Sequence, residues 1–211
     1  AVMVMAACTP NAKISGTIES APSSEVIVKL LDVNRYQVLD TIATDAAGHF
    51  SYKVNVHKGQ PKFVYIFRND TKVASLLLEA GDKVSVSADT LGNYTVEGSE
   101  ESQKLAQVEK DHAAAMGRLN AIAARMENAS EKDMAELRRE IGKEYVDYYR
   151  NRVLYVLKNS TSLTSVPVLF QNFGADLPVF SQTTDAIHFM NVSDSLATVY
   201  PESKYVKALR K

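Results

Sequence analysis

The feature that most constrains this chain is a change of hydrophobic period at Gly98-Ser99. Before this point, apolar residues recur at every second position, as they do from Phe50 to Val56. After it, they recur at alternating intervals of three and four from Leu105 to Met126. A period of two is typical of a half-buried strand, and a period between three and four is typical of an amphipathic helix. The sequence therefore predicts an α+β fold whose strands precede its helices.

The region 12–98 is expected to form an N-terminal antiparallel β-sandwich domain. Seven or eight short apolar stretches are separated by turn signals such as Asp45-Ala46-Ala47-Gly48, where aspartate bonds the following backbone and glycine accepts a positive φ. The alternation from Phe50 to Val56 predicts one buried face and one wet face. Many short strands with regular turns are typical of two packed sheets.

The region 99–211 is expected to form a helical domain. Ser130 is placed to cap a second long helix, with Asp133 at the third position in a variant of the capping box. Two long helices joined by a short loop pack antiparallel, so the pattern predicts a long helical hairpin. Beyond Asn159 the apolar stretches are shorter and indicate short C-terminal helices.

Residues 1–11 differ from the rest and are expected to be the end of a lipoprotein signal and a tether. Met5-Ala6-Ala7 places small side chains before Cys8, as the cleavage site of a lipoprotein signal requires. Lipidation of Cys8 would hold the protein on a membrane surface. The alternative is a buried first strand with an incidental cysteine.

Composition excludes several classes of protein. The formal net charge is −1, from 24 basic and 25 acidic side chains, whereas a nucleic-acid-binding protein usually carries a basic excess. Cys8 is the single cysteine, so an internal disulfide and a Cys-x-x-Cys redox pair are both excluded. No apolar run is long enough to span a membrane. No motif for a phosphate, nucleotide or other cofactor occurs, and no cofactor is expected.

No catalytic or metal-binding set is expected either. His188 lies close in sequence to Asp185 and Ser193, yet no Gly-x-Ser-x-Gly elbow accompanies them. His49 and His57 share one face of a strand but lie too far apart along it to bind one ion. An enzyme that assembles its site from distant acidic residues is the alternative that the sequence leaves open.

One local enrichment indicates a possible binding surface. Tyrosine and arginine are concentrated between Tyr145 and Tyr155, and both residue types are common at interfaces. The first interpretation is packing in a core or at a domain interface, because tyrosine also closes cores with its hydroxyl in water. The alternative is a binding surface, for which Tyr149, Arg150 and Arg152 are the candidate residues, with Tyr149 the tyrosine most suited to exposure.

The order of several short motifs resembles that of a known family. These motifs are Ile14-Ser15-Gly16-Thr17-Ile18, Thr44-Asp45-Ala46-Ala47-Gly48-His49-Phe50, Leu78-Glu79-Ala80-Gly81-Asp82-Lys83-Val84, Leu177-Pro178-Val179-Phe180, Asp194-Ser195-Leu196-Ala197-Thr198-Val199-Tyr200-Pro201 and Ser203-Lys204-Tyr205-Val206-Lys207. The chain resembles the N-terminal region of Bacteroidetes envelope lipoproteins that carry a β-rich domain of unknown function, a helical segment and then a thioredoxin-like domain. Those proteins are described as thiol:disulfide interchange or peroxiredoxin-like proteins.

This resemblance implies a non-catalytic, membrane-anchored module. The redox domain would begin after Lys211, so no catalytic residue transfers, and Cys8 transfers as the lipid acceptor. The implied location is the bacterial cell envelope, at the periplasmic face of the outer membrane, because residues 9–13 lack an acidic export signal. The implied partners are the membrane, the redox domain or another envelope protein, with the ligand unknown. The alternative is a stand-alone lipoprotein that binds a glycan or a peptide.

Overall fold

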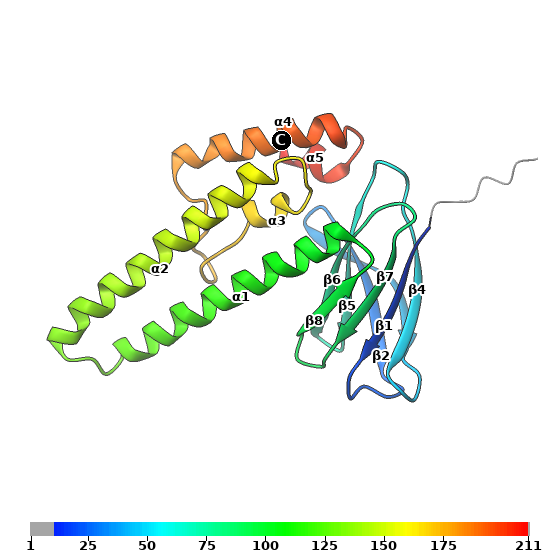
Figure 1. Cartoon of the computed structure of the whole chain (residues 1–211), viewed down its shortest axis with the longest axis horizontal. Helices are drawn as coiled ribbons and strands as arrows, with labels where there is room; N and C mark the ends of the chain where they lie inside the picture. The colour runs from blue at the N-terminus through cyan, green and yellow to red at the C-terminus, as the bar shows by residue number, and fades with distance from the viewer. Residues whose placement is uncertain (1–10, 211) are drawn as a thin grey trace, which may run out of the picture. The chain divides into compact units, whose positions relative to one another are not determined.

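The computed structural model describes residues 11–210, and it confirms the predicted α+β order of strands followed by helices (Figure 1). The chain divides into two compact units. The β unit holds the strands, the start of the first long helix and the segment 200–208. The helical unit holds residues 107–199 with Leu209 and Arg210.

The β unit contains eight strands in two sheets, as the sequence predicts. They are β1 (Asn11–Ile18), β2 (Glu25–Asp32), β3 (Arg35–Ala43), β4 (His49–Asn55), β5 (Lys62–Arg68), β6 (Thr71–Leu78), β7 (Lys83–Ala88) and β8 (Tyr94–Glu97). One sheet has the order β4-β1-β7-β8 and the other the order β3-β2-β5-β6. All neighbouring strands pair antiparallel except β1 and β7, which are parallel.

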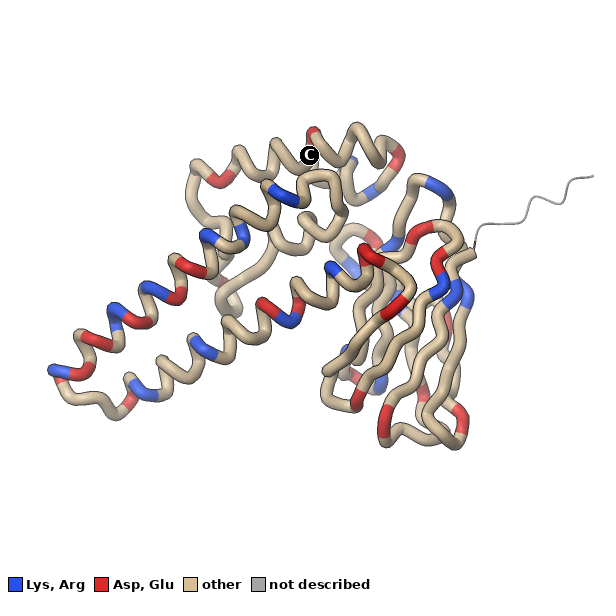
Figure 2. Tube along the Cα trace, viewed as in Figure 1, with Lys and Arg blue, Asp and Glu red and all other residues tan. Residues whose placement is uncertain are grey.

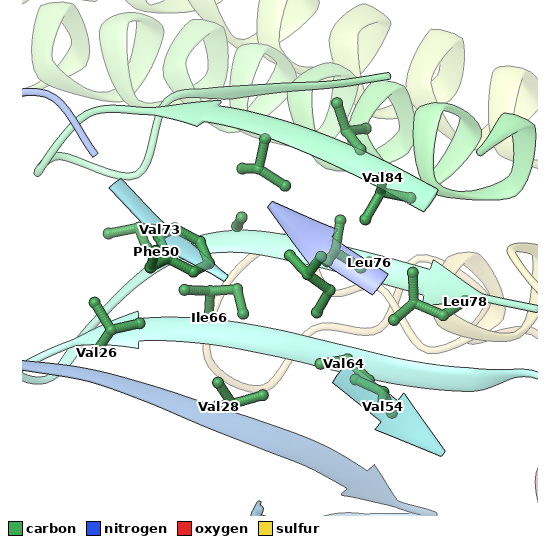
Figure 3. Packing of buried hydrophobic residues seen from close by; sticks show 14 of the residues in the cluster. Val26, Val28, Phe50, Val54, Val64, Ile66, Val73, Leu76, Leu78 and Val84 are labelled. Carbon is green, nitrogen blue, oxygen red and sulfur yellow. The ribbon is translucent and has the colours of Figure 1, made fainter. Parts of the chain in front are cut away.

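The core of the β unit lies between the two sheets and is apolar (Figure 3). Ile14, Val26, Ile66 and Leu76 are fully buried there, because the side chains of each strand alternate between the two faces of its sheet. The ring of Phe50 lies over Gly16 of the neighbouring strand, where an added Cβ would come within 2.4 Å of that ring. Gly16 is therefore required by this close approach.

The segment after Val199 packs on the outer face of the second sheet through α5 (Lys204–Leu209). The Tyr205 hydroxyl donates a hydrogen bond to the Leu31 carbonyl at 2.8 Å and accepts one from the Phe63 backbone N–H at 3.3 Å. Its ring meets the Phe63 ring edge-on at a centroid distance of 5.1 Å. Lys204 pairs with Asp32 at 2.8 Å. Lys204 and Tyr205 therefore pack against strands β2 and β5, which lie far earlier in the sequence.

The helical unit is built on α1 (Glu100–Met126) and α2 (Glu131–Lys158). Arg118 pairs with Glu144 and Arg125 pairs with Glu140, and this inverse order confirms that the two helices are antiparallel. Charged residues of both signs follow α2 along its length (Figure 2). The unit is completed by α3 (Ser165–Leu169), the 3-10 turn η1 (Thr183–Asp185) and α4 (Ala186–Val199).

The helix caps confirm one prediction and show how two shorter elements begin. The Ser130 hydroxyl accepts a hydrogen bond from the Asp133 backbone N–H at 3.2 Å, which is the predicted N-cap of α2. Ser165 is the first residue of α3, and its hydroxyl donates to the Asn159 carbonyl. The 3-10 turn η1 precedes α4, and its Asp185 side chain accepts the backbone N–H of Gln182.

Candidate functional site

The tyrosine–arginine segment of α2 does not present all its predicted residues to solvent. Arg150 is exposed, Tyr149 is half-buried, and Arg152 is only 6% exposed. The spacing explains the difference, because Arg152 lies one helical turn from the buried Tyr148 and Val156 and therefore shares their face. The structure does not bring the three predicted residues together as one surface.

Arg152 is held inside the helical unit with an incomplete set of partners. Its guanidinium lies 5.0 Å from the ring centre of Tyr148 and 5.5 Å from that of Tyr155. Its nearest carboxylate oxygen, on Asp111, is 3.5 Å away. Its Nε and Nη1 atoms are buried and make no hydrogen bond. The Arg152 cation therefore has two aromatic faces and one distant carboxylate as its partners, and this arrangement indicates a packing role.

The Tyr149 hydroxyl forms a hydrogen bond with a partner that the sequence did not indicate. Its hydroxyl donates to Asp185 at 2.6 Å, and this bond together with burial raises the pKa of Tyr149 to about 12. Asp185 is 2% exposed and also accepts the backbone N–H of Gln182 at 2.9 Å. Tyr149 therefore ties α2 to the start of α4 and does not offer a free hydroxyl.

His188, Asp185 and Ser193 lie close in sequence, and their side chains have different surroundings in the structure. The Nδ1 atom of His188 and the hydroxyl of Ser193 are buried and make no hydrogen bond. Asp185 is occupied by Tyr149 and Gln182. Within residues 11–210, no group of three histidine, cysteine or acidic side chains gathers closely enough to hold a metal ion.

A second candidate region is the outer face of the sheet β3-β2-β5-β6, away from the core. Tyr36 of β3 meets the rings of Tyr65 and Phe67 edge-on, at centroid distances of 5.2 Å and 5.6 Å. The Lys29 ammonium lies 3.9 Å from the Phe67 ring centre, and Lys72 lies 5.4 Å from that of Tyr65. Lysines at these distances are attracted by the aromatic faces and cover them.

The exposed part of this outer face lies on β3. Tyr65 and Phe67 are 7% and 9% exposed, whereas Tyr36 and Val38 are 51% and 56% exposed. β3 is an edge strand, so it has a neighbour on one side only. A strand of this kind combines exposed apolar side chains with backbone groups that lack a neighbouring strand. We call the stretch Arg35–Val38 the open edge.

The predicted lipid acceptor, Cys8, lies outside the described residues 11–210. No helix in the described part of the chain is both long enough and apolar enough to cross a membrane.

Comparison with known proteins identifies one family for part of the chain. Residues 12–105 match the family described as Domain of unknown function (DUF4369). The matched stretch spans all but the first residue of the eight strands and the beginning of α1, so the chain carries an N-terminal domain of unknown function. A search of curated proteins found no match to this chain.

Proposed function

We propose that this chain is a non-catalytic, membrane-anchored scaffold and binding module of an envelope lipoprotein. The observation that carries the binding role is the open edge, where Tyr36 and Val38 are more than half exposed on a strand with one free side. The residues most suited to chemistry, Asp185 and Arg152, are instead buried among packing partners. Arrangements of this kind favour recognition of a partner over conversion of a substrate.

The anchoring role rests on the sequence Met5-Ala6-Ala7-Cys8. Metabolic labelling with a radioactive fatty acid tests it directly, using the protein expressed from its native gene. We expect the label and membrane fractionation to be lost together in Cys8→Ser, because the thiol is the acceptor of the lipid. An unlabelled native protein, or a Cys8→Ser protein that keeps the label, would contradict the proposal.

We further propose, from the family resemblance, that the module serves a thioredoxin-like redox domain following Lys211 in the complete protein. The chain itself should then show no thiol–disulfide exchange in an insulin reduction assay, because an exchange centre uses two cysteines. Reduction that persists in Cys8→Ser would overturn the non-catalytic assignment. Reading the coding sequence past Lys211 tests the redox partner separately.

A stand-alone binding lipoprotein is the second candidate, and the aromatic cluster favours a peptide over a glycan. Sugars stack on open aromatic faces, but Lys29 covers the face of Phe67, and Tyr65 is nearly buried. Tyr36 is the one ring of this cluster that is more than half exposed. A thermal-shift screen with envelope glycans and peptides tests the binding role, because a ligand of the folded state raises its melting temperature. A folded sample that no compound stabilises would count against it.

A further inference from the structure

The two ends of β3 differ in how they are protected from pairing with another strand. Near its C-terminal end the backbone N–H of Thr41 is bonded at 2.8 Å to the side chain of Asp40. A register shift beside Val28 and Lys29 also interrupts the pairing of β2 with β3. Bulges and charged side chains are the usual means by which edge strands are blocked from pairing with another chain. The open edge, at the other end, has no register shift, and its one charged residue, Arg35, lies 3.7 Å from Asp32.

The register of β3 determines which of its backbone groups face away from β2. Asp32 pairs with Arg35 across a two-residue turn whose first residue, Val33, has a positive φ of 61°. In a hairpin with so short a loop, the flanking pair shares the ladder hydrogen bonds, and the next pair does not. By this alternation, the N–H and C=O groups of Tyr36 and Val38 face the free side. They are the groups that an added strand would use.

The outer face beside the open edge is positively charged. On each strand, the core residues face the other sheet, and the residues between them face outward. The pairing register then shows which of these outward residues lie near the open edge. The outward residues are Glu25, Ile27, Lys29, Leu31, Tyr36, Val38, Thr41, Ala43, Phe63, Tyr65, Phe67, Lys72, Ser75 and Leu77. This set contains two lysines and one carboxylate, Glu25, which lies at the end of β2 away from the open edge. Lys29 has aromatic rings and no carboxylate as its neighbours among the described residues.

We propose that the open edge binds an extended acidic peptide segment of a partner protein, which pairs with Arg35–Val38 as an additional strand. Backbone hydrogen bonds to Tyr36 and Val38 supply the pairing, as in other cases of strand addition to an exposed edge. Alternate acidic side chains of the peptide lie over the lysine-bearing face, beside Lys29. This inference rests on the proposed binding function and names the class of its ligand.

A second copy of this chain is a poorer occupant of the same edge. Pairing of two open edges would bring Arg35 and Lys29 of both copies toward one interface, and like charges at an interface are unfavourable. Arg35 is exposed and lies 3.7 Å from Asp32, which is already paired with Lys204 at 2.8 Å. An acidic segment complements this surface, whereas a second copy repeats its charge.

Fluorescence anisotropy with a labelled octapeptide of alternating glutamate and valine tests the proposal on the full chain carrying Cys8→Ser. We expect saturable binding that weakens as salt is raised, because part of the attraction is electrostatic. The same peptide with lysine in place of glutamate should bind at least about tenfold more weakly, since it loses the charge complementarity. A peptide N-methylated at alternate residues lacks the pairing N–H groups and should also fail to bind.

Val38→Pro probes the backbone of the open edge, with Thr41→Pro as the matched control. Proline is tolerated on an edge strand where its missing N–H would face solvent, so both variants should keep the melting temperature within a few degrees of the parent. Val38→Pro should weaken binding of the glutamate peptide about tenfold, equivalent to one or two net hydrogen bonds. Thr41→Pro should bind like the parent, because the Thr41 N–H is already occupied by Asp40.

Lys29→Gln separates charge from pairing, since it keeps the length of the side chain and removes its cation. It should weaken the glutamate peptide severalfold and reduce the salt dependence of binding. The proposal would be overturned if the lysine peptide bound equally well or if the glutamate peptide showed no saturable binding. It would also be overturned by an unchanged affinity in Val38→Pro or by self-association through this edge. If a glycan or another peptide still stabilised the chain in the thermal-shift screen, the general binding function would stand without it.

Discussion

The β unit and the helical unit bury polar groups in opposite ways. The main cluster of the β unit contains only apolar side chains, and Tyr205 and Ser102 form hydrogen bonds with backbone groups of the sheet β3-β2-β5-β6. The two charged side chains buried among the described residues, Arg152 and Asp185, both lie in the helical unit. The core of the β unit is therefore apolar, and a few polar side chains bond to its backbone. The helical unit instead contains polar side-chain pairs in its interior.

This difference indicates how each unit should respond to mutation. Loss of a large side chain that closes the β unit leaves a cavity and an unpaired backbone donor, and both are costly. Removal of a poorly paired buried charge from the helical unit relieves a desolvation cost. Variants in each unit test this contrast.

Tyr205→Ala should destabilise the β unit by about 3–5 kcal/mol, the usual cost of deleting a large buried aromatic side chain. The Tyr205 side chain packs on Phe63 and bonds the backbone of both Leu31 and Phe63. Tyr205→Phe keeps the ring and removes the hydroxyl, so it should cost about 1 kcal/mol. Urea unfolding followed by circular dichroism measures both changes. A loss below about 1 kcal/mol in Tyr205→Ala would show that α5 does not stabilise the β unit.

The packing of α5 marks the limit of what the sequence predicts about the fold. The change of period at Gly98-Ser99 correctly separated strands from helices, and the order of elements followed from local patterns. Hydrophobic period describes which face of an element is apolar, but it contains no information about which distant element covers that face. The contact between Tyr205 and Phe63, far apart in sequence, therefore became visible only in three dimensions.

The candidate sites show a similar limit. Composition singled out the tyrosine–arginine segment, but tyrosine and arginine serve both interfaces and interiors. Whether Arg152 is exposed depends on the neighbours that its helix face meets, and Asp185 lies far along the chain from Tyr149. The open edge was missed because strand order decides which strand lies at an edge, and strand order is a property of the whole sheet.

Gly98→Ala tests the junction between strands and helices, and should be the second-largest effect. Gly98 has a φ of 87°, and an added Cβ would lie 2.1 Å from the Lys83 carbonyl oxygen. Gly81 has a similar φ of 90° with no atom within 4 Å of the added Cβ, so Gly81→Ala is the matched control. The control should cost about 1–2 kcal/mol for its left-handed backbone, and Gly98→Ala clearly more. Equal melting temperatures for the two variants would contradict the predicted clash.

Arg152→Met should leave the stability of the helical unit unchanged or raise it by about 1 kcal/mol, because a long apolar side chain replaces a buried cation. Asp111, its partner, is 41% exposed and can be solvated when the cation is removed. Arg150→Met, at an exposed position of the same helix, is the control and should change stability by less than about 0.5 kcal/mol. A loss of 2 kcal/mol or more in Arg152→Met would show that the cation has a stabilising partner.

Alkaline pH should weaken the bond between Tyr149 and Asp185 in the helical unit. The pKa of Tyr149 is raised from 10.0 to about 12, so its contribution to stability is fully present below pH 10.0 and is lost as the pH rises toward about 12. Melting temperatures measured from pH 9 to pH 12 should therefore fall more steeply in the parent than in Tyr149→Phe. Parallel curves would show that this hydroxyl does not couple folding to pH.

Acid should act on the β unit through the turn before β4, with the smallest of these effects. The backbone N–H groups of His49 and Ala47 bond the Asp45 carboxylate at 2.9 Å and 2.8 Å, and they lower the pKa of Asp45 below its ordinary value of 3.8. Because the folded state favours the ionised carboxylate, its contribution is present above pH 3.8 and is lost as the pH falls further.

Asp45→Asn separates this turn from the other carboxylates of the β unit, since an amide oxygen still accepts both N–H bonds and does not titrate in this range. The difference in melting temperature between the parent and Asp45→Asn should be constant above pH 4 and shrink below it. Asp45 is exposed, so salt should reduce the part that comes from its contact with the His49 ring at 3.1 Å and leave the backbone bonds in place. A difference that stays constant from pH 5 to pH 2 would mean that the turn is held equally well by the neutral acid.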